Sequence, residues 1–150
     1  MKLSKFIAEA KKATYAGNDA EKKLPDESKE LIYEKNNLIY RDRYFGSKSF
    51  SGQEVIFNKN KPIWSMNYYG RSLKGLLLTK KIYNFLRKAL LRIPESSPFR
   101  GPRKLVNCSW RYRNDWNGDL KNFNGKEKIF YKDELVYELE YFGGIVKNDS

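Results

Sequence analysis

The sequence predicts an α+β protein, built from an internally duplicated unit of one helix followed by antiparallel strands. Three observations predict this fold: two segments with apolar residues at helical spacing, several short alternating segments separated by turn residues, and a repeat that relates the two halves of the chain. The strands are expected to form a curved or barrel-like sheet with the two helices packed on it. The 150 residues suit a single domain, 1–150, with repeats at about 1–75 and 76–150.

The repeat is seen most clearly in two pairs of predicted strands. Their residues match at a constant offset of 73 positions, as in Gly52 and Gly125, and each half carries 15 basic and 9 acidic residues. The alternative is that two unrelated hairpins share aromatic and turn residues by chance. The matched ranges are 52–59 with 125–132, 64–70 with 137–143 and, after one inserted residue, 40–42 with 112–114.

In the first half, Leu3, Phe6, Ile7 and Ala10 follow the spacing of a helix face, which predicts a helix over residues 2–14. A polar stretch with a proline, residues 17–29, follows the helix and reads as a connection. Asparagine tolerates the backbone angles of a tight turn, so two hairpins are expected. Their strands are 30–35 with 38–45, turning at 36–37, and 52–58 with 62–69, turning at 59–60.

In the second half, Ile82, Phe85, Leu86 and Ala89 repeat the helical spacing and predict a helix over residues 80–93. Thr79 is the expected N-cap, and prolines at 94 and 98 end the helix. Strands follow at 104–116, 127–131 and 135–142, with the turn of the last hairpin at 132–134. Within the first of these strands, Cys108 alternates with its neighbours and reads as a small core residue.

Neighbouring residues of a strand point to opposite faces of a sheet, so the pattern assigns two faces. One face is apolar and should pack under a helix: Tyr137, Leu139 and Tyr141 in the second half, and Trp64, Met66 and Tyr68 in the first. The other face mixes arginines, acids, amides and aromatic rings. A sheet that curls would turn that face into a groove.

Composition excludes several classes of function. The net charge is +12, there is no histidine, and the single cysteine excludes an internal disulfide. A zinc site and imidazole-based catalysis are therefore not expected, and we expect neither a metal nor a cofactor. No apolar run is long enough for a membrane span, and the charged N-terminal segment is unlike a signal peptide, so a cytoplasmic protein is expected.

Arginines beside aromatic residues are the feature that points to a ligand. Guanidinium groups bind phosphate or carboxylate through paired hydrogen bonds, and flat rings stack on a base, so the combination predicts a small anionic, nucleotide-like ligand. The alternative is that the arginines pair with nearby carboxylates on a solvated sheet face. The predicted ligand-binding residues are Arg41, Arg43, Tyr44, Asn67, Tyr69, Arg71, Phe99, Arg100, Arg103, Arg113, Trp116, Glu138 and Glu140.

The loop at residues 97–103 contains two prolines and one glycine, which can hold Arg100 and Arg103 in fixed positions for a ligand. We therefore expect replacing either arginine by alanine to weaken binding with little effect on the melting temperature. The alternative is that the loop only connects the helix to the next strand.

Three other function classes remain open. A net charge of +12 on a curved sheet also suits nucleic acid, which would bind with a steep dependence on salt concentration. Glu138 and Glu140 share one face of a strand and could form the carboxylate pair of a hydrolase. A protein-interaction module is the third alternative.

The chain contains several long and specific motifs: Tyr40–Gly46, Gly52–Val55, Lys61–Arg71, Pro98–Arg103 and Tyr112–Asn114. In these motifs it resembles the bacterial family of domains of unknown function 5680. Such domains occur alone and attached to helix-turn-helix DNA-binding domains, an arrangement similar to effector sensing. The resemblance therefore implies a domain that binds a small molecule, either to sense it or, as phage-encoded sponges do, to sequester it.

Overall fold

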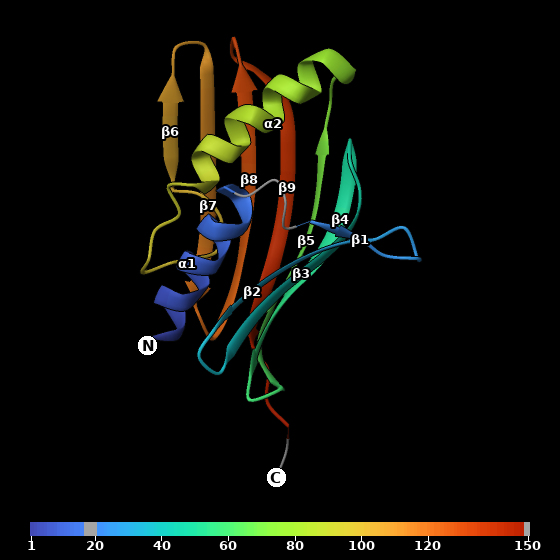
Figure 1. Cartoon of the computed structure of the whole chain (residues 1–150). Coiled ribbons are helices and arrows are strands. Elements are labelled where there is room, and N and C mark those ends of the chain that lie inside the picture. The colour runs from blue at the N-terminus through green and yellow to red at the C-terminus, as the bar shows by residue number, and fades with distance from the viewer. Residues whose placement is uncertain (17–20, 149–150) are drawn as a thin grey trace.

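In the computed structural model, which describes residues 1–16 and 21–148, two helices lie against one face of a single antiparallel sheet (Figure 1). The fold is α+β and consists mostly of sheet, as predicted. The helices are α1 (Leu3–Ala16) and α2 (Leu76–Leu90). The strands are β1 (Lys22–Lys23), β2 (Lys29–Lys35), β3 (Leu38–Gly46), β4 (Ser49–Asn58), β5 (Lys61–Ser72), β6 (Lys104–Asn107), β7 (Trp110–Asp119), β8 (Asn122–Tyr131) and β9 (Glu134–Ile145).

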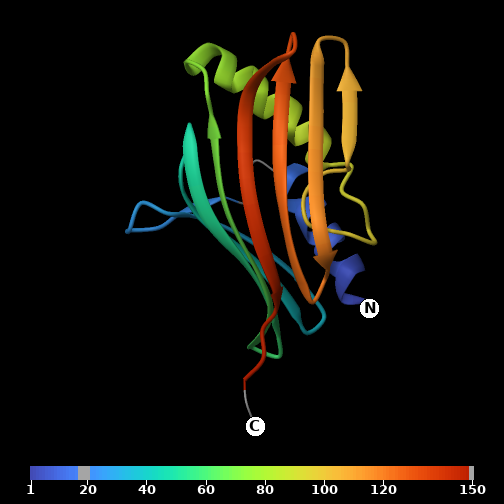
Figure 2. The same ribbon diagram turned by 180° about the vertical axis from the view of Figure 1, so that it is seen from behind.

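The strand order is β1-β2-β3-β4-β5-β9-β8-β7-β6, so β5 and β9 form the centre and each half of the chain builds one side. The sheet is open, with β1 and β6 as its edges, so it is a curved sheet rather than a closed barrel. In Figure 1, β2 and β3 pass in front of β5 and β9 on the side of the helices, whereas Figure 2 shows β9 nearest the viewer. The sheet therefore bends toward its helix-covered face.

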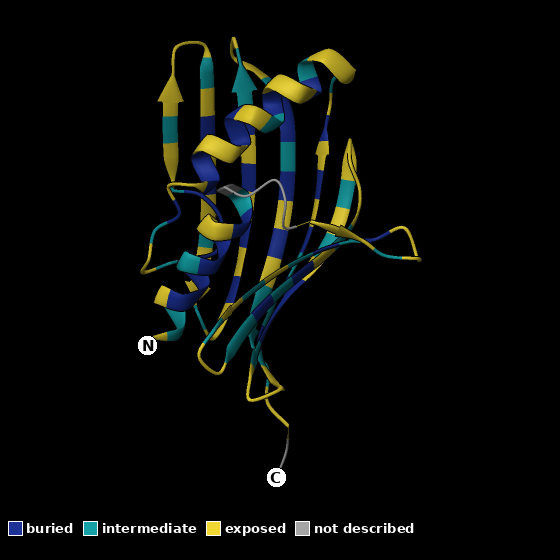
Figure 3. Ribbon diagram, viewed as in Figure 1, coloured by how far each residue is buried: buried dark blue, intermediate teal, exposed yellow. Residues whose placement is uncertain are grey.

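The core lies between the helices and this face. The predicted apolar row of β5 and β9 is confirmed: Trp64, Met66 and Tyr68, and their counterparts Tyr137, Leu139 and Tyr141, are each at most 7% exposed. Figure 3 shows the buried positions alternating with exposed ones along the strands. The face that carries no helix is called the open face below.

The first and last residues of both helices differ from the predicted ones, 2–14 and 80–93. α1 ends at Ala16, and α2 begins at Leu76 with Gly75 as its N-cap, so Thr79 lies inside the first turn. The Thr79 hydroxyl is 2.9 Å from the carbonyl oxygen of Gly75 and 2.7 Å from Ser72 Oγ, which makes it a buried bridge between the helix and β5. Neither of the described helices is long and apolar enough to cross a membrane.

The predicted strand at 104–116 is wrong, because the chain turns back on itself between β6 and β7. Cys108 occupies that turn with a φ of +54° and is exposed, so it is not a core residue. No glycine or proline marks this turn, which is why sequence reasoning missed it. The predicted turns at 36–37 and 59–60 are confirmed, and the turn predicted at 132–134 occupies 132–133, because Glu134 already pairs with Tyr131 as the first residue of β9. Part of the polar 17–29 connection, residues 17–20, lies outside the described residues.

Candidate functional site

The sheet divides the predicted ligand-binding residues into separate groups. On β7, Tyr112 and Asn114 are buried and Arg113 is exposed, and the other strands alternate in the same way. Tyr44 and Trp116 lie on the helix-covered face, and Phe99, Arg100 and Arg103 lie in the loop after α2. The predicted groove therefore does not bring all thirteen together. The open face carries Arg41, Arg43, Asn67, Tyr69, Arg71, Arg113, Glu138 and Glu140.

The arginines of the open face interact with neighbouring side chains. Such exposed ion pairs each stabilise a protein by about 0–1 kcal/mol. They therefore contribute little to the stability of the fold and mainly keep this face polar. Arg43 Nε lies 2.5 Å from Glu30 Oε2, Arg71 Nη2 lies 2.9 Å from Glu138 Oε1, Arg113 Nε lies 2.8 Å from Asp115 Oδ2, and the Arg41 guanidinium lies 4.9 Å from the centre of the Phe57 ring.

Tyr69, Arg71, Glu138 and Glu140 do lie together, around a hollow of about 390 Å³ on the open face. Both glutamates are paired there, because Lys126 Nζ lies 3.6 Å from Glu140 Oε1 and Arg71 binds Glu138. This arrangement offers charged side chains to a surface ligand, with each acid already next to a cation.

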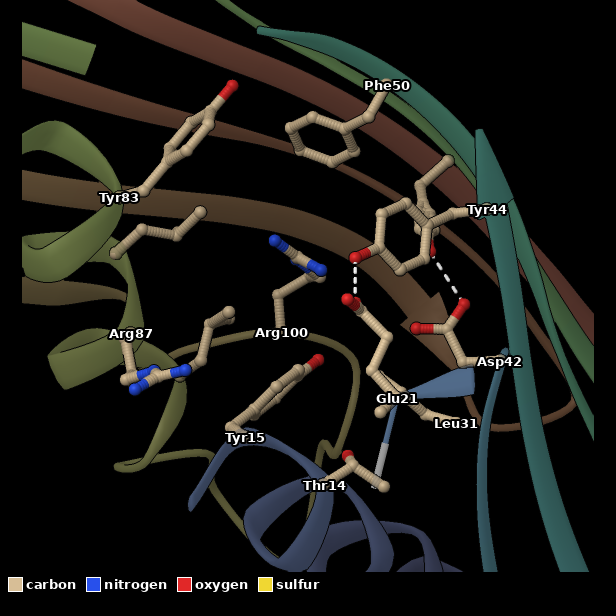
Figure 4. Close-up of a pocket in the computed structure, with 13 residues that line it drawn as sticks. Thr14, Tyr15, Glu21, Leu31, Asp42, Tyr44, Phe50, Tyr83, Arg87 and Arg100 are labelled. Carbon is tan, nitrogen blue, oxygen red and sulfur yellow. Dashed lines mark hydrogen bonds between the residues drawn. The ribbon is translucent and has the colours of Figure 1, made fainter. Parts of the chain in front are cut away.

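A different cavity, of about 300 Å³, lies between α1, α2 and the strands of the first half (Figure 4). Five of its lining residues are aromatic, and four of these are tyrosines, so we call it the tyrosine cavity. Rings and aliphatic side chains share its wall with charged and hydroxyl groups, and small-molecule sites commonly combine apolar walls with polar groups that orient the ligand. Its lining residues are Thr14, Tyr15, Glu21, Leu31, Asp42, Tyr44, Phe50, Tyr68, Tyr83, Leu86, Arg87, Leu90 and Arg100.

Asp42 is the buried acid of the tyrosine cavity. The Tyr68 hydroxyl donates a hydrogen bond of 2.6 Å to Asp42 Oδ1, and Figure 4 shows the second carboxylate oxygen turned toward the cavity. Burial, reinforced by the nearby Glu54 carboxylate, raises the pKa of Asp42 to about 7. Tyr68 reaches this position across Gly52, where a Cβ atom would lie 2.4 Å from the tyrosine oxygen.

Arg100 is the buried cation of the cavity. Its Nε and Nη2 atoms donate hydrogen bonds of 3.1 and 2.9 Å to the two oxygens of Glu127, and its guanidinium points into the cavity in Figure 4. Burial opposes the charge, but the Glu127 carboxylate outweighs that effect and holds the pKa of Arg100 above its usual range. Arg100 is thus part of the buried structure as well as the cavity wall, and its Nη1 group lies outside the pair with Glu127.

The hydroxyl groups of the remaining tyrosines differ in their hydrogen-bond partners. The Tyr83 hydroxyl donates to the carbonyl oxygens of Ser47 and Lys48 at 2.8 and 2.7 Å, and the Tyr44 hydroxyl donates to the carboxylate of Glu21. Among the described residues, the buried Tyr15 hydroxyl has no hydrogen-bond partner. A ligand in the cavity would therefore meet ring faces, one unpartnered hydroxyl, a carboxyl group and a guanidinium.

Sequence reasoning found Tyr44 and Arg100 of this cavity but missed Asp42, Tyr68 and Tyr83. The sequence marks Asp42 only as a difference between the repeats, since the matched ranges 40–42 and 112–114 end in aspartate in one half and asparagine in the other, and its burial beside a cavity follows from the packing alone. No group of three or more cysteine, aspartate or glutamate side chains in the described part of the chain is arranged to hold a metal ion.

Residues 42–146 match the family model described as Domain of unknown function (DUF5680). The matched range contains most of the lining of the tyrosine cavity, including Asp42 and Arg100, whereas Thr14, Tyr15, Glu21 and Leu31 precede it. No match was found among curated proteins or among solved structures.

Proposed function

The chain belongs to the DUF5680 family of domains of unknown function, and we propose that it binds a small planar ligand in the tyrosine cavity without transforming it. One observation carries the proposal: a cavity of about 300 Å³ walled by aromatic rings contains the buried polar groups of Asp42 and Arg100. Small-molecule sites span roughly 300–1,000 Å³. A cavity at the lower end of that range suits one ring system, such as the base of a nucleotide-like ligand.

Binding of this kind serves either to sense the ligand or to sequester it. The walls favour a flat ring, because the tyrosines and Phe50 offer faces for stacking and Arg100 offers an N–H donor. Arg87 also lines the cavity. The ligand is thus proposed to bind in the tyrosine cavity and not in the groove predicted between the repeats.

Native mass spectrometry of protein purified from its natural cells tests the proposal. We expect a co-purified small molecule on the wild type that is lost in Leu31→Trp, because the indole fills the cavity. Ile32→Trp is the matched control, since the neighbouring side chain is 45% exposed and does not line the cavity. A wild type that carries no small molecule, or a Leu31→Trp variant that keeps it, would contradict the proposal.

Nucleic-acid binding is the second candidate, and the open face favours it. Phe45, Tyr69 and Phe142 are 50–61% exposed there, and single strands stack on exposed rings beside cations. Fluorescence anisotropy with a labelled single-stranded RNA would show affinity that falls steeply with NaCl concentration and that drops in a Tyr69→Ala, Phe142→Ala double variant. Salt-independent binding, or an unaffected double variant, would exclude this candidate.

We also propose that the two halves are copies of one duplicated unit. Gly46 and Gly118 adopt φ values of +88° and +90° at matching strand ends. The β4–β5 and β8–β9 ladders both shift register at matching places, between Ile56 and Phe57 and between Ile129 and Phe130. These correspondences support the match seen in the sequence.

A further inference from the structure

Asp42 and Asn114 hold corresponding positions on the helix-covered face of β3 and β7. Each accepts a hydrogen bond from a tyrosine hydroxyl across the sheet, from Tyr68 at 2.6 Å and from Tyr141 at 2.8 Å. Both acceptors are buried. The same local arrangement therefore occurs once in each half, with a carboxyl group in one half and an amide in the other.

In the second half, the loop after α2 covers this arrangement. Asn114 Nδ2 donates a hydrogen bond of 2.9 Å to the carbonyl oxygen of Gly101, and the Gly101 N–H donates one of 3.0 Å to the Tyr112 hydroxyl. The Tyr112 hydroxyl itself donates to Glu127 Oε2 at 2.5 Å, so the polar groups of Asn114 and Tyr112 are satisfied by the loop backbone together with the side chains of Tyr141 and Glu127.

In the first half, the corresponding place contains the tyrosine cavity. Asp42 lines the cavity, and the Tyr40 hydroxyl, the counterpart of Tyr112, is buried without a hydrogen-bond partner among the described residues. The hydroxyl of Tyr15, on the wall of the cavity, is in the same state. Buried polar groups without partners are rare in folded proteins. Of these two hydroxyls, that of Tyr15 belongs to a residue that lines the cavity, so Tyr15 and Asp42 are the groups that a ligand there could contact.

The chemistry of that ligand follows from the charges around it. Two buried acids near the cavity already have cations, since Lys11 Nζ lies 3.0 Å from Glu54 Oε1 and Arg100 binds Glu127. Among the described residues no cation lies within ion-pair distance of Asp42, and the Tyr68 hydroxyl binds it instead. Its remaining lone pairs therefore call for N–H donors, whereas the Nη1 group of Arg100, outside the pair with Glu127, calls for an acceptor.

We infer that the ligand is a guanine-like ring whose two adjacent N–H donors bind the Asp42 carboxylate and whose carbonyl oxygen accepts from Arg100. This inference rests on the proposed function and names the ligand class of the same cavity. A carboxylate accepts two parallel N–H bonds from such an edge, and an adenine-like edge presents a ring acceptor to it instead. Asp42 is then the residue that determines specificity.

Ionisation of Asp42 should couple binding to pH. With a pKa of about 7, its ionised fraction rises from about a tenth at pH 6 to about nine-tenths at pH 8. The carboxylate is the form that accepts both N–H bonds. The titratable and charged groups around Asp42 and the cavity are Lys11 and Tyr15 of α1, Glu21, Tyr40 and Tyr44 of β3, Glu54 of β4, Tyr68 of β5, Tyr83 and Arg87 of α2, and Arg100 and Glu127.

Isothermal titration calorimetry with guanosine and adenosine at pH 6 and pH 8 tests the inference. Guanosine should bind the wild type about tenfold more tightly at pH 8 than at pH 6, because binding follows the ionised fraction of Asp42. At pH 8, adenosine should bind at least tenfold more weakly than guanosine. Asp42→Asn should lose both the guanosine affinity, by tenfold or more, and its pH dependence.

Asp115→Asn is the matched control, because it makes the same chemical change on the open face, where Asp115 pairs with Arg113. It should leave guanosine binding unchanged. No measurable guanosine binding, equal binding of adenosine, or an unaltered Asp42→Asn variant would overturn the inference. A co-purified ligand without this donor edge, lost in Leu31→Trp, would overturn it while leaving the proposed function intact, whereas a ligand-free wild type would remove both.

Discussion

Glu54 and Glu127 occupy matching places on β4 and β8, and each is fully buried beside a cation that comes from a different kind of element. Lys11 on α1 is the partner of Glu54, whereas Arg100 in the loop after α2 is the partner of Glu127. Because an isolated charge is costly to bury, each acid requires its cation in the folded state. The two halves thus meet the same requirement with different residues.

Replacing Arg100 by alanine should destabilise the protein, in contrast to the sequence-based expectation of weaker binding with little change in melting temperature. The change leaves Glu127 buried without its cation, a situation that costs about 3–5 kcal/mol. Urea denaturation of the unliganded protein measures the loss. Arg103→Ala is the control, because Arg103 is exposed and only stacks on Trp116 at 3.6 Å; equal stability losses in the two variants would contradict this prediction.

Lys11→Met should also lower the free energy of unfolding, by about 3–5 kcal/mol, because Glu54 would lose its cation in the core. Adding Glu54→Gln to Lys11→Met should recover most of that loss, since no buried charge then remains unpaired. Urea denaturation of the two single variants and the double variant measures this coupling. Additive losses in the double variant would show that the pair does not act as a unit.

Gly52→Ala should destabilise the fold by about 1–3 kcal/mol, the usual range for overpacking. The new Cβ atom would lie 2.4 Å from the Tyr68 oxygen and 2.7 Å from the backbone oxygen of Arg43, so the tyrosine would have to move away from Asp42. Thermal denaturation compares it with Ser51→Ala, at the exposed neighbouring position. A Gly52→Ala variant with unchanged thermal stability would contradict this prediction, because Tyr68 could then move away from the new Cβ atom at no cost.

The buried acid Asp42 should make stability fall as pH rises. Its pKa is raised from 3.8 to about 7 on folding, so the stability contributed by its protonated form is complete below pH 4 and is lost as pH rises to about 7. The slope from this group is at most about 1.4 kcal/mol per pH unit. Urea denaturation at pH 5 and pH 8 should show a smaller loss in Asp42→Asn than in the wild type, and parallel losses would refute the assignment.

Local patterns in the sequence determined the secondary structure and the two sheet faces. The four-residue spacing of Phe6 and Ala10, and of Ile82 and Leu86, predicted both helices because one turn of a helix brings such residues to one side. Alternation on β9 predicted that Leu139 is buried and Glu140 exposed. The turn at Cys108 escaped prediction, because the left-handed backbone angle falls on a cysteine and neither a glycine nor a proline marks the place, so the β6–β7 pairing alone reveals it.

Which side chains meet was decided only by the tertiary structure. Arg100 and Arg113 both follow aromatic-rich motifs, yet one is buried against Glu127 and the other pairs with Asp115 on the opposite side of the sheet. The tyrosine cavity joins α1, α2, the loop after α2 and the strands of the first half, and Asp42 becomes its buried acid only when these elements pack together. Burial and charge pairing depend on residues distant in the chain, so no local pattern could reveal them.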